Sequence, residues 1–347
     1  MALSGYDALL VLSFGGPEGE DEVIPFLENV TRGRGIPRER LAQVGEHYFH
    51  FGGVSPINGQ NRELIRNIEA ELAGRGHDLP VYFGNRNWHP FAEDTAKQLE
   101  DDGRTNVLVL ATSAWGGYSA CRQYDEDIQR LREVTPQIDY TKLWQFYGHP
   151  TFIELMAGKV KGAVDKQEGS ARVLFTAHSV PTAADTAAGG PGDEHLYSRQ
   201  VAEASRLVAE AAGVGTYEVV WQSRSGNPAT PWLEPDVVDR LEELDNQEHF
   251  DTLVCVPIGF ITDHMEVVWD LDTELRQACE ARGVALERVD TVGLEPAFAQ
   301  MIVDIAECVA QGTEPQTLST VTVQGCTVNG SPCSPHCCEP VRRPARG

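Results

Sequence analysis

Basic residues are scarce in this chain of 347 residues. Lys and Arg number 28 against 52 Asp and Glu, which gives a formal net charge of −24 at pH 7. A surface of that sign repels a phosphate backbone, so we exclude nucleic acid as a partner. Most of the charge is attributed to a solvated acidic surface that aids solubility.

Long apolar runs and a targeting segment are also missing. No stretch approaches the ~18 apolar residues of a membrane span, and the start, MALSGYDALLVLSFGG, lacks a basic region and passes straight into a strand pattern. We therefore expect a cytoplasmic protein without stable membrane insertion. Nucleotide-binding patterns are absent as well, since the glycines of SFGGPEG do not have the G-x-G-x-x-G spacing and no P-loop occurs.

Cysteine is sparse over most of the chain and concentrated near its end. Four cysteines occur singly, and four crowd together at Cys326, Cys333, Cys337 and Cys338. Because a cytoplasmic chain seldom keeps disulfides, a terminal group of this kind more often binds metal.

Apolar runs bounded by turn signals predict eight strands, at 8–16, 79–85, 105–113, 138–146, 171–179, 216–223, 251–260 and 284–292. Helical patterns separate most of them, and this alternation predicts an α/β protein with helices on both faces of parallel sheets. The strands divide four and four, so we expect two similar domains, 1–165 and 166–312. The last helical pattern, 295–312, has an apolar face that fits either domain, including a return to the first, and 313–347 is expected to be a Cys-rich extension.

Two predicted strand ends carry residues suited to catalysis. The functional loops of open parallel sheets lie beyond the carboxyl ends of the strands, where TAHSVP contains His178 and ITDHMEVVWDLDTE contains His264 and a row of acids. Glu266, Asp270 and Glu274 have i, i+4, i+8 spacing, which keeps them on one drifting face of a helix. Like charges at this spacing destabilise a helix by roughly 0.2–0.5 kcal/mol per pair, unless protons or a cation offset them.

Each of these two motifs alone has a plainer interpretation. His178 fits a buried histidine with its hydrogen bonds satisfied, and the acids fit a solvated helix face. Against the second interpretation, the intervening 267–269 are apolar, so the start of this helix should be partly buried. Buried carboxylates have raised pKa values and exchange protons near neutral pH, which suits proton transfer or the delivery of an ion such as Fe²⁺.

Other loops offer groups for an anionic ligand. NVTRGRG supplies Arg32 and Arg34, FGGVSPI supplies Ser55 beside the start of a helix, and Tyr124 and Ser223 are further hydrogen-bond donors. Together these groups suit carboxylates or phosphates, although a plain surface turn accounts equally well for each loop alone.

The chain closely resembles the ferrochelatases, which insert Fe²⁺ into porphyrins. Six segments carry the resemblance in order: LLVLSFGGP, FGGVSPI, YSACRQY, FTAHSVP, WQSRSGNPATPWLEPD and GFITDHMEVVWDLDTE. It implies two flavodoxin-like chelatase domains, each with a four-stranded parallel sheet, a porphyrin held in the cleft between them, and an unusually wound helix for the acidic ladder. It also implies distortion of the macrocycle, followed by removal of two pyrrole protons as the iron enters.

The resemblance also implies roles for single residues. His178 looks like the histidine thought to bind the metal or to accept a pyrrole proton, and Glu266 looks like the glutamate opposite it, which His264 supports. Asp270 and Glu274 resemble the next acidic rungs, used for metal or proton traffic.

One position departs from part of the family. Phe14 occupies the place where some bacterial members have a tyrosine, so no oxygen ligand for the metal can come from there. We expect its ring to pack on the porphyrin.

The terminal cysteines resemble those of family members that hold a [2Fe-2S] cluster with one internal and three C-terminal cysteines. Cys121 in YSACRQY is similar to the internal ligand, and the resemblance implies Cys326, Cys333 and either Cys338 or Cys337 as the others, since such clusters normally have four thiolate ligands. A structural zinc site and unpaired cysteines are the alternatives.

Cluster-bearing sequences with CRQY are similar to the actinobacterial branch, whose substrate is coproporphyrin III, a tetracarboxylate. Four carboxylates need more polar partners than the two of protoporphyrin IX, and the candidates are Arg32, Arg34, Ser55, Tyr124 and Ser223. The expected protein is a monomeric ferrochelatase, a lyase that forms coprohaem in haem biosynthesis. The alternatives are a protoporphyrin ferrochelatase, a Co²⁺ or Ni²⁺ chelatase for another tetrapyrrole, and, without turnover, a porphyrin carrier or an iron–sulfur redox sensor.

Overall fold

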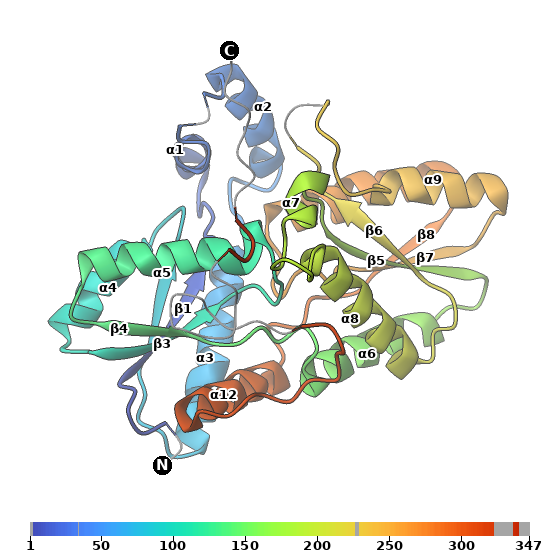
Figure 1. The fold of residues 1–347 in the computed structure, drawn as a ribbon. Helices are drawn as coiled ribbons and strands as arrows, with labels where there is room; N and C mark the ends of the chain where they lie inside the picture. Colours follow the sequence, from blue (N-terminus) through green and yellow to red (C-terminus); the bar gives the residue numbers. More distant parts are fainter. Residues whose placement is uncertain (1–2, 34, 226–228, 323–335, 340–347) are drawn as a thin grey trace.

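Two four-stranded parallel sheets form the framework of the protein (Figure 1). The computed structural model describes residues 3–33, 35–225, 229–322 and 336–339. The first sheet has the order β2-β1-β3-β4 and the second the order β6-β5-β7-β8, with all neighbours parallel. The strands are β1 (Ala8–Ser13), β2 (Val81–Asn85), β3 (Asn106–Ala111), β4 (Asp139–Lys142), β5 (Ala171–His178), β6 (Glu218–Gln222), β7 (Thr252–Val256) and β8 (Ala285–Arg288). The predicted fold class is confirmed, and both sheets have the same strand order.

Several strands are shorter than their apolar runs predict. Residues 138–146, 251–260 and 284–292 give only β4, β7 and β8. Beyond these strand ends the chain stays buried, as Leu143, Phe146 and Ile258 show. These apolar residues cover the core next to the sheet, so hydrophobicity alone marks the interior and not the end of strand pairing.

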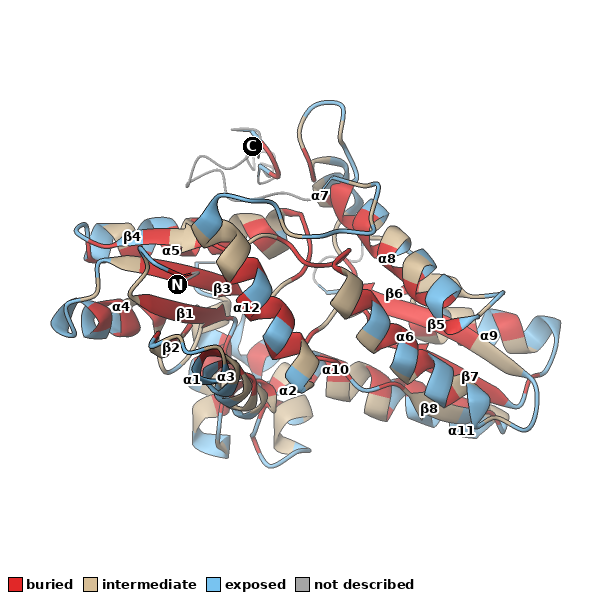
Figure 2. Ribbon diagram, turned by 90° about the horizontal axis from the view of Figure 1, so that it is seen from below, coloured by how far each residue is buried: buried red, intermediate tan, exposed pale blue. Residues whose placement is uncertain are grey.

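Helices pack on both faces of the sheets, with buried inner and exposed outer faces (Figure 2). In the first half they are α1 (Glu20–Val30), α2 (Arg38–Phe49), α3 (Ile57–Gly74), α4 (Ala92–Asp101), η1 (Tyr118–Arg122), α5 (Gln123–Val134) and α6 (Pro150–Asp165). In the second half they are α7 (Thr182–Thr186), α8 (Leu196–Ala212), α9 (Val237–Gln247), α10 (Met265–Trp269), η2 (Asp270–Leu275), α11 (Arg276–Arg282) and α12 (Pro296–Gln311). Both η1 and η2 are π-helical turns. None of the helices in the described ranges is long and apolar enough to cross a membrane.

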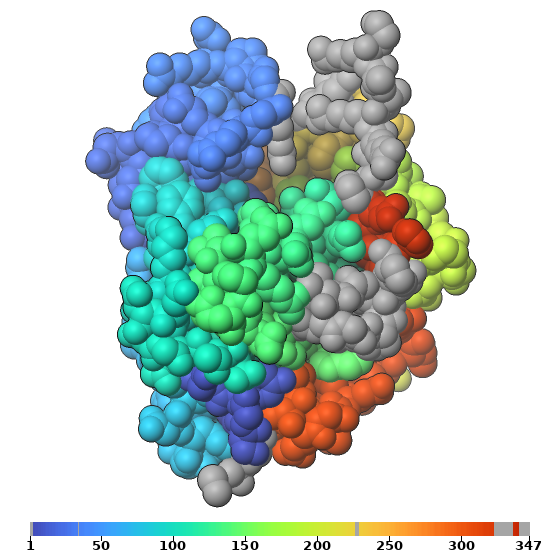
Figure 3. All heavy atoms as spheres, turned by 60° about the vertical axis from the view of Figure 1, so that its left-hand side comes forward, coloured from blue at the N-terminus to red at the C-terminus, as the bar shows by residue number. Residues whose placement is uncertain are grey.

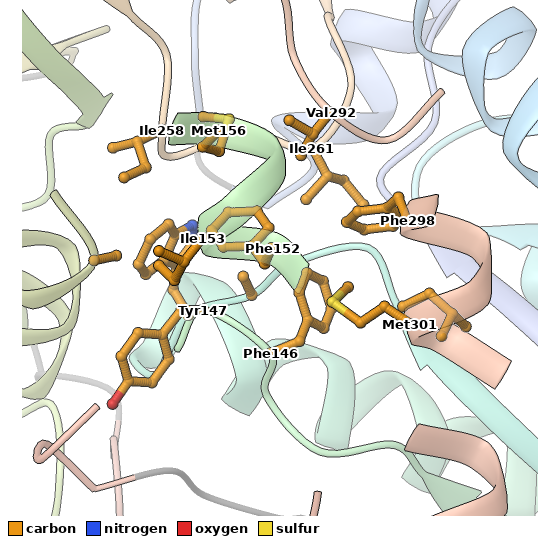
Figure 4. Packing of buried hydrophobic residues seen from close by; sticks show 14 of the residues in the cluster. Phe146, Tyr147, Phe152, Ile153, Met156, Ile258, Ile261, Val292, Phe298 and Met301 are labelled. Carbon is orange, nitrogen blue, oxygen red and sulfur yellow. The ribbon is translucent and has the colours of Figure 1, made fainter. Parts of the chain in front are cut away.

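The helix α12 follows the second sheet in sequence but returns to the first half, where it lies beside α3 (Figure 1). Polar contacts hold it there, including the ion pair of Arg75 Nη1 with Asp304 Oδ1 at 2.6 Å and the contact of His77 Nε2 with Glu307 Oε1 at 2.9 Å. Its inner face joins a core shared by both halves, in which the rings of Phe146 and Phe298 lie 5.5 Å apart (Figure 4). One continuous apolar core therefore fixes the two halves relative to each other.

Candidate active site

A pocket with a volume of about 410 Å³ lies between the two halves, a size that suits a small-molecule ligand. Its walls come from the segments that follow β1, β3, β5 and β7. The chain order reverses between β1 and β3 in the first sheet and between β5 and β7 in the second. Ligands of open parallel sheets bind at such switch points. The lining includes Phe14, Ser113, Tyr118, His178, Gly259 and His264.

His178 and Glu266 face each other on the wall of this pocket. His178 is the last residue of β5, Glu266 lies in α10, and Nε2 of the histidine is 3.3 Å from Oε2 of the glutamate. The other ring nitrogen, Nδ1, faces the carbonyl oxygen of Ser179. A carbonyl only accepts, so Nδ1 carries a proton, and Nε2 is the nitrogen that gains or loses one.

Each member of this pair favours the charged form of the other. Burial disfavours the imidazolium of His178, but the Glu266 carboxylate, the Ser179 carbonyl and Asp270 together outweigh burial and raise the pKa of the histidine. Burial likewise favours neutral Glu266, but the charge and hydrogen bond of His178, together with His264, outweigh it and lower the pKa of the carboxyl. The pair can therefore hold a proton at Nε2 near neutral pH beside a permanent negative charge.

His264 occupies the residue before α10 and also lines the pocket. Its ring lies 4.9 Å from that of Phe260, and burial lowers its pKa. It is thus a mainly neutral imidazole beside Glu266, at the N-terminal end of the helix that carries the acidic ladder.

The acidic ladder runs from α10 into η2, which confirms the unusual winding that the family resemblance implies. An α-helix has 3.6 residues per turn, so i+4 overshoots a full turn, whereas a π turn with i→i+5 bonds takes more residues. Around the helix axis, Asp270 is therefore rotated past Glu266 in one direction, and Glu274 is rotated back in the other direction relative to Asp270. Glu274, at the far end of the ladder, accepts a hydrogen bond from Trp269 Nε1 at 2.9 Å.

Asp270 is the rung held most closely by the protein. Ser223 Oγ donates a short hydrogen bond to its Oδ2, and Gln222 Nε2 approaches the same oxygen at 3.3 Å. Burial, together with the charges of Glu266 and Glu274, raises the pKa of Asp270 to about 7 despite these hydrogen bonds. A carboxyl with this pKa can both accept and release a proton at neutral pH.

Two further acids of ITDHMEVVWDLDTE, Asp263 and Asp272, bind one arginine and do not belong to the ladder. Arg288, the last residue of β8, contacts Asp263 Oδ2 at 2.8 Å and Asp272 Oδ2 at 2.9 Å through Nη2. These carboxylates are neutralised and stabilise the start and the π turn of the helix. The sequence contains no pattern that pairs residue 288 with them.

The predicted porphyrin-binding residues fall into different places. The pocket lining includes Phe14, Ser55 and Tyr124, and of these Phe14 is exposed. Ser223 instead binds Asp270, while Arg32 is exposed and does not line the pocket. Arg34 lies outside the described residues.

Sequence reasoning missed several residues of the pocket wall. Trp115 donates from Nε1 to the carbonyl of Gly259 at 2.8 Å, which ties the β3 loop to the β7 loop. Tyr197 donates from its hydroxyl to the carbonyl of His178 at 2.7 Å and so fixes the end of β5. Trp115 lies in ATSAWGGYSACRQY, whose place after a strand is a usable signal, but Tyr197 in α8 has none.

Three of the predicted cluster cysteines lie together. Cys121, Cys337 and Cys338 are buried, the sulfurs of Cys337 and Cys338 are 3.3 Å apart, and the side chains of Cys121 and Cys338 are hydrogen-bonded. Gly189 holds the segment 336–339 in place, since its N–H donates to Cys338 Sγ at 3.3 Å. Figure 3 shows residues from the end of the chain, in red, next to yellow-green residues of the second half. Buried thiols gathered in this way fit a thiolate-bound metal group. Cys326 and Cys333 lie outside the described residues, and within the described ranges no complete group of three or more ligands for a metal ion is found.

The fold is that of known chelatases. SirB from Bacillus subtilis with Fe³⁺ matches with a TM-score of 0.54 at 13% identity, covering 90% of this chain and 100% of that one. The sirohydrochlorin chelatase SirB from Bacillus subtilis subspecies spizizenii, in complex with cobalt, matches with a TM-score of 0.52 at 13% identity, covering 88% and 96%. At such identity these likenesses define the class of fold alone.

The sequence comparisons define the family. The ferrochelatase family model matches residues 6–309. The chain is 57% identical over 341 residues to the coproporphyrin III ferrochelatase of Corynebacterium glutamicum, covering 96% of this chain and 92% of the relative. It is 53% identical over 346 residues to that of Nocardia farcinica, covering 98% of each. The protein belongs to the ferrochelatase family.

Proposed function

We propose that this protein is a lyase that inserts Fe²⁺ into coproporphyrin III to form coprohaem in haem biosynthesis. The observation that carries the proposal is the pair of His178 Nε2 and Glu266 Oε2, 3.3 Å apart on the wall of a pocket between the two halves. The named relatives from Corynebacterium and Nocardia support coproporphyrin III as the substrate.

Insertion requires that two pyrrole nitrogens lose their protons as iron binds. In the proposed mechanism His178 accepts a proton at Nε2, and Glu266 stabilises the resulting imidazolium. Asp270, with its pKa of about 7, then relays protons outward toward Glu274, and the same carboxylates attract the incoming cation. His264 supports Glu266 at the start of the helix.

We assign the binding of the macrocycle to the pocket walls that face His178 and Glu266. The exposed ring of Phe14 offers an apolar contact for the porphyrin face. Ser55 and Tyr124 line the pocket but are buried, and the Tyr124 hydroxyl lies 3.1 Å from Thr112 Oγ1, so they are candidates for carboxylates only after local rearrangement. Arg32 remains a candidate for a carboxylate outside the pocket proper, and Arg34 remains a candidate from the sequence alone. Contacts on both faces allow binding energy to distort the ring and expose a nitrogen lone pair.

We also propose a [2Fe-2S] cluster as resident cofactor, bound by Cys121, Cys338 or Cys337, Cys326 and Cys333. The buried thiols beside Cys121 support this choice over unpaired cysteines. When bound, such a group supplies one-electron redox chemistry and a rigid link between the C-terminal segment and η1. A cytoplasmic location and a monomeric state stay predictions from the sequence.

The substrate proposal is tested by anaerobic incubation with Fe²⁺ and either coproporphyrin III or protoporphyrin IX, followed by absorption spectroscopy. We expect the iron coproporphyrin spectrum to form faster than the iron protoporphyrin spectrum. Equal or reversed rates would refute the choice of porphyrin. Preferential insertion of Co²⁺ or Ni²⁺ in a competition with Fe²⁺ would refute the choice of metal.

A further inference from the structure

Gln123, the first residue of α5, lines the active-site pocket with an amide whose orientation is fixed by an arginine. Its Oε1 accepts a hydrogen bond from Arg86 Nη1 at 3.2 Å. A guanidinium only donates, so the atom that faces Arg86 is the amide oxygen, and the other end of the amide is the NH₂ group. Among the described residues this Nε2 has no acceptor. Because Gln123 is partly exposed, its N–H groups are available to a ligand in the pocket.

Arg86 is a nearly buried cation behind this wall. Its side chain is 12% exposed, Nε lies 2.7 Å from Oδ2 of Asp127, and the guanidinium carbon lies 4.7 Å from the centre of the Tyr124 ring. Asp127 also pairs with Arg130, so one carboxylate is shared between two guanidinium groups. The remaining nitrogen of Arg86, Nη2, is buried and has no acceptor among the described residues. This part of the wall therefore has more donors than acceptors.

Two neighbouring hydroxyl groups on the pocket wall are less accessible than the amide. The hydroxyl oxygens of Tyr124 and Thr112 lie 3.1 Å apart, so one of them donates to the other. Ser55 is buried, with 3% of its surface exposed. Compared with Tyr124 and Ser55, Gln123 is the donor that a ligand reaches without rearrangement of the wall.

The carboxylates are the hydrogen-bond acceptors on the rim of a metal-free porphyrin, since its other substituents are apolar. We propose that Gln123 is a specificity-determining residue whose Nε2 donates to a carboxylate of the porphyrin, and that Arg86 is the positioning residue that turns the amide toward it. This inference rests on the proposed porphyrin substrate. Hydrogen bonds to an ionised acceptor are the stronger ones. A cation that donates to Oε1 polarises the amide, which makes its N–H a better donor.

The first test removes the donor from the full-length protein. Fluorescence titration gives the Kd of metal-free coproporphyrin III, and anaerobic Fe²⁺ insertion gives kcat and KM. In Q123L we expect Kd and KM to rise ~10-fold, the scale of one hydrogen bond to a charged group, with kcat unchanged because Gln123 touches no reacting atom. Wild-type Kd and KM in Q123L would overturn the role of Gln123. No insertion by wild type would instead refute the proposed function itself.

Q123E separates ligand binding from a structural role. A glutamate at this position still accepts from Arg86 and has the same size, so the wall should stay in place. Its charge repels a carboxylate, and we expect Kd to rise more than in Q123L. Gln129, on the exposed side of the same helix, provides the matched control Q129E, which should bind like wild type. Wild-type binding by Q123E, or an equal loss in Q129E, would overturn the proposal.

Arg86 is tested by a double-mutant cycle. R86M leaves Asp127 paired with Arg130, and a thermal melt like that of wild type shows that it folds. Without the guanidinium the amide can turn either way, so Kd should rise at least ~2-fold. In the Q123L background the same change should have no further effect. An unchanged Kd in R86M, or losses that add in R86M/Q123L, would show that Arg86 does not act through Gln123.

Discussion

Nε2 of His178 at the end of β5 lies 3.3 Å from Oε2 of Glu266 in α10, although 88 positions separate the two residues in the sequence. The parallel sheet explains the meeting, since β5 and β7 are neighbours and both carboxyl ends point into the same pocket. Each partner of the pair therefore influences the protonation state of the other.

Glu266→Gln removes the charge but keeps the size of the side chain. Without the carboxylate, burial of His178 is opposed only by the Ser179 carbonyl and by Asp270, so the pKa of the histidine should fall below the wild-type value. We expect insertion to slow ~10²-fold, in the range of general acid–base effects. Steady-state kinetics and NMR titration of His178 measure both effects, and an unchanged histidine pKa would contradict the pairing.

Asp270→Asn should stabilise the protein at high pH more than at low pH. The pKa of Asp270 is raised to about 7 in the folded protein and lies near 3.9 when unfolded. As pH rises between these values, the unfolded chain releases the proton first, so the wild type loses stability by at most about 1.4 kcal/mol per pH unit. The advantage of D270N should grow from pH 4 to 7 and then level off. Denaturant unfolding over this range measures it, and a constant difference would contradict the raised pKa.

Ser223 has a left-handed backbone with φ of 62°, a conformation that costs a non-glycine residue about 1–2 kcal/mol. Ser223→Gly and Ser223→Ala both remove the hydroxyl that binds Asp270, but only glycine relieves the backbone. S223G should therefore unfold at higher denaturant concentration than S223A, while both lose iron insertion to a similar extent. Equal stability of S223A and S223G would refute the backbone strain. Iron insertion at the wild-type rate in both variants would refute a role for the contact with Asp270.

Phe298→Ala tests the core that joins the two halves. The ring is fully buried in α12 and meets Phe146 at 5.5 Å. Its removal should lower the free energy of unfolding by ~3–5 kcal/mol. The exposed Leu318→Ala should change it by less than about 0.5 kcal/mol. Equal effects of the two variants in denaturant unfolding would contradict a shared core.

The sheets and the two strand-end motifs could be predicted from the sequence because apolar runs and their exits are local patterns. Other features are not local. The π turn depends on more than residue spacing, and Arg288 meets Asp263 and Asp272 only after β8 has joined β7. Ser223 has the hydroxyl expected for ligand binding, yet its backbone turns it onto Asp270. Residue type indicates what a side chain can do, but the fold decides which partner it meets.

The most direct test compares anaerobic Fe²⁺ insertion into coproporphyrin III by wild type, His178→Ala and His249→Ala. His249 is exposed, and among the hydrogen bonds described its ring binds only Asp245, so it controls for the loss of a histidine. We predict catalysis by wild type and H249A, a ~10²–10⁴-fold lower rate for H178A, and porphyrin binding by all three. Insertion by H178A at the wild-type rate, or no insertion by wild type above the uncatalysed rate, would contradict the account.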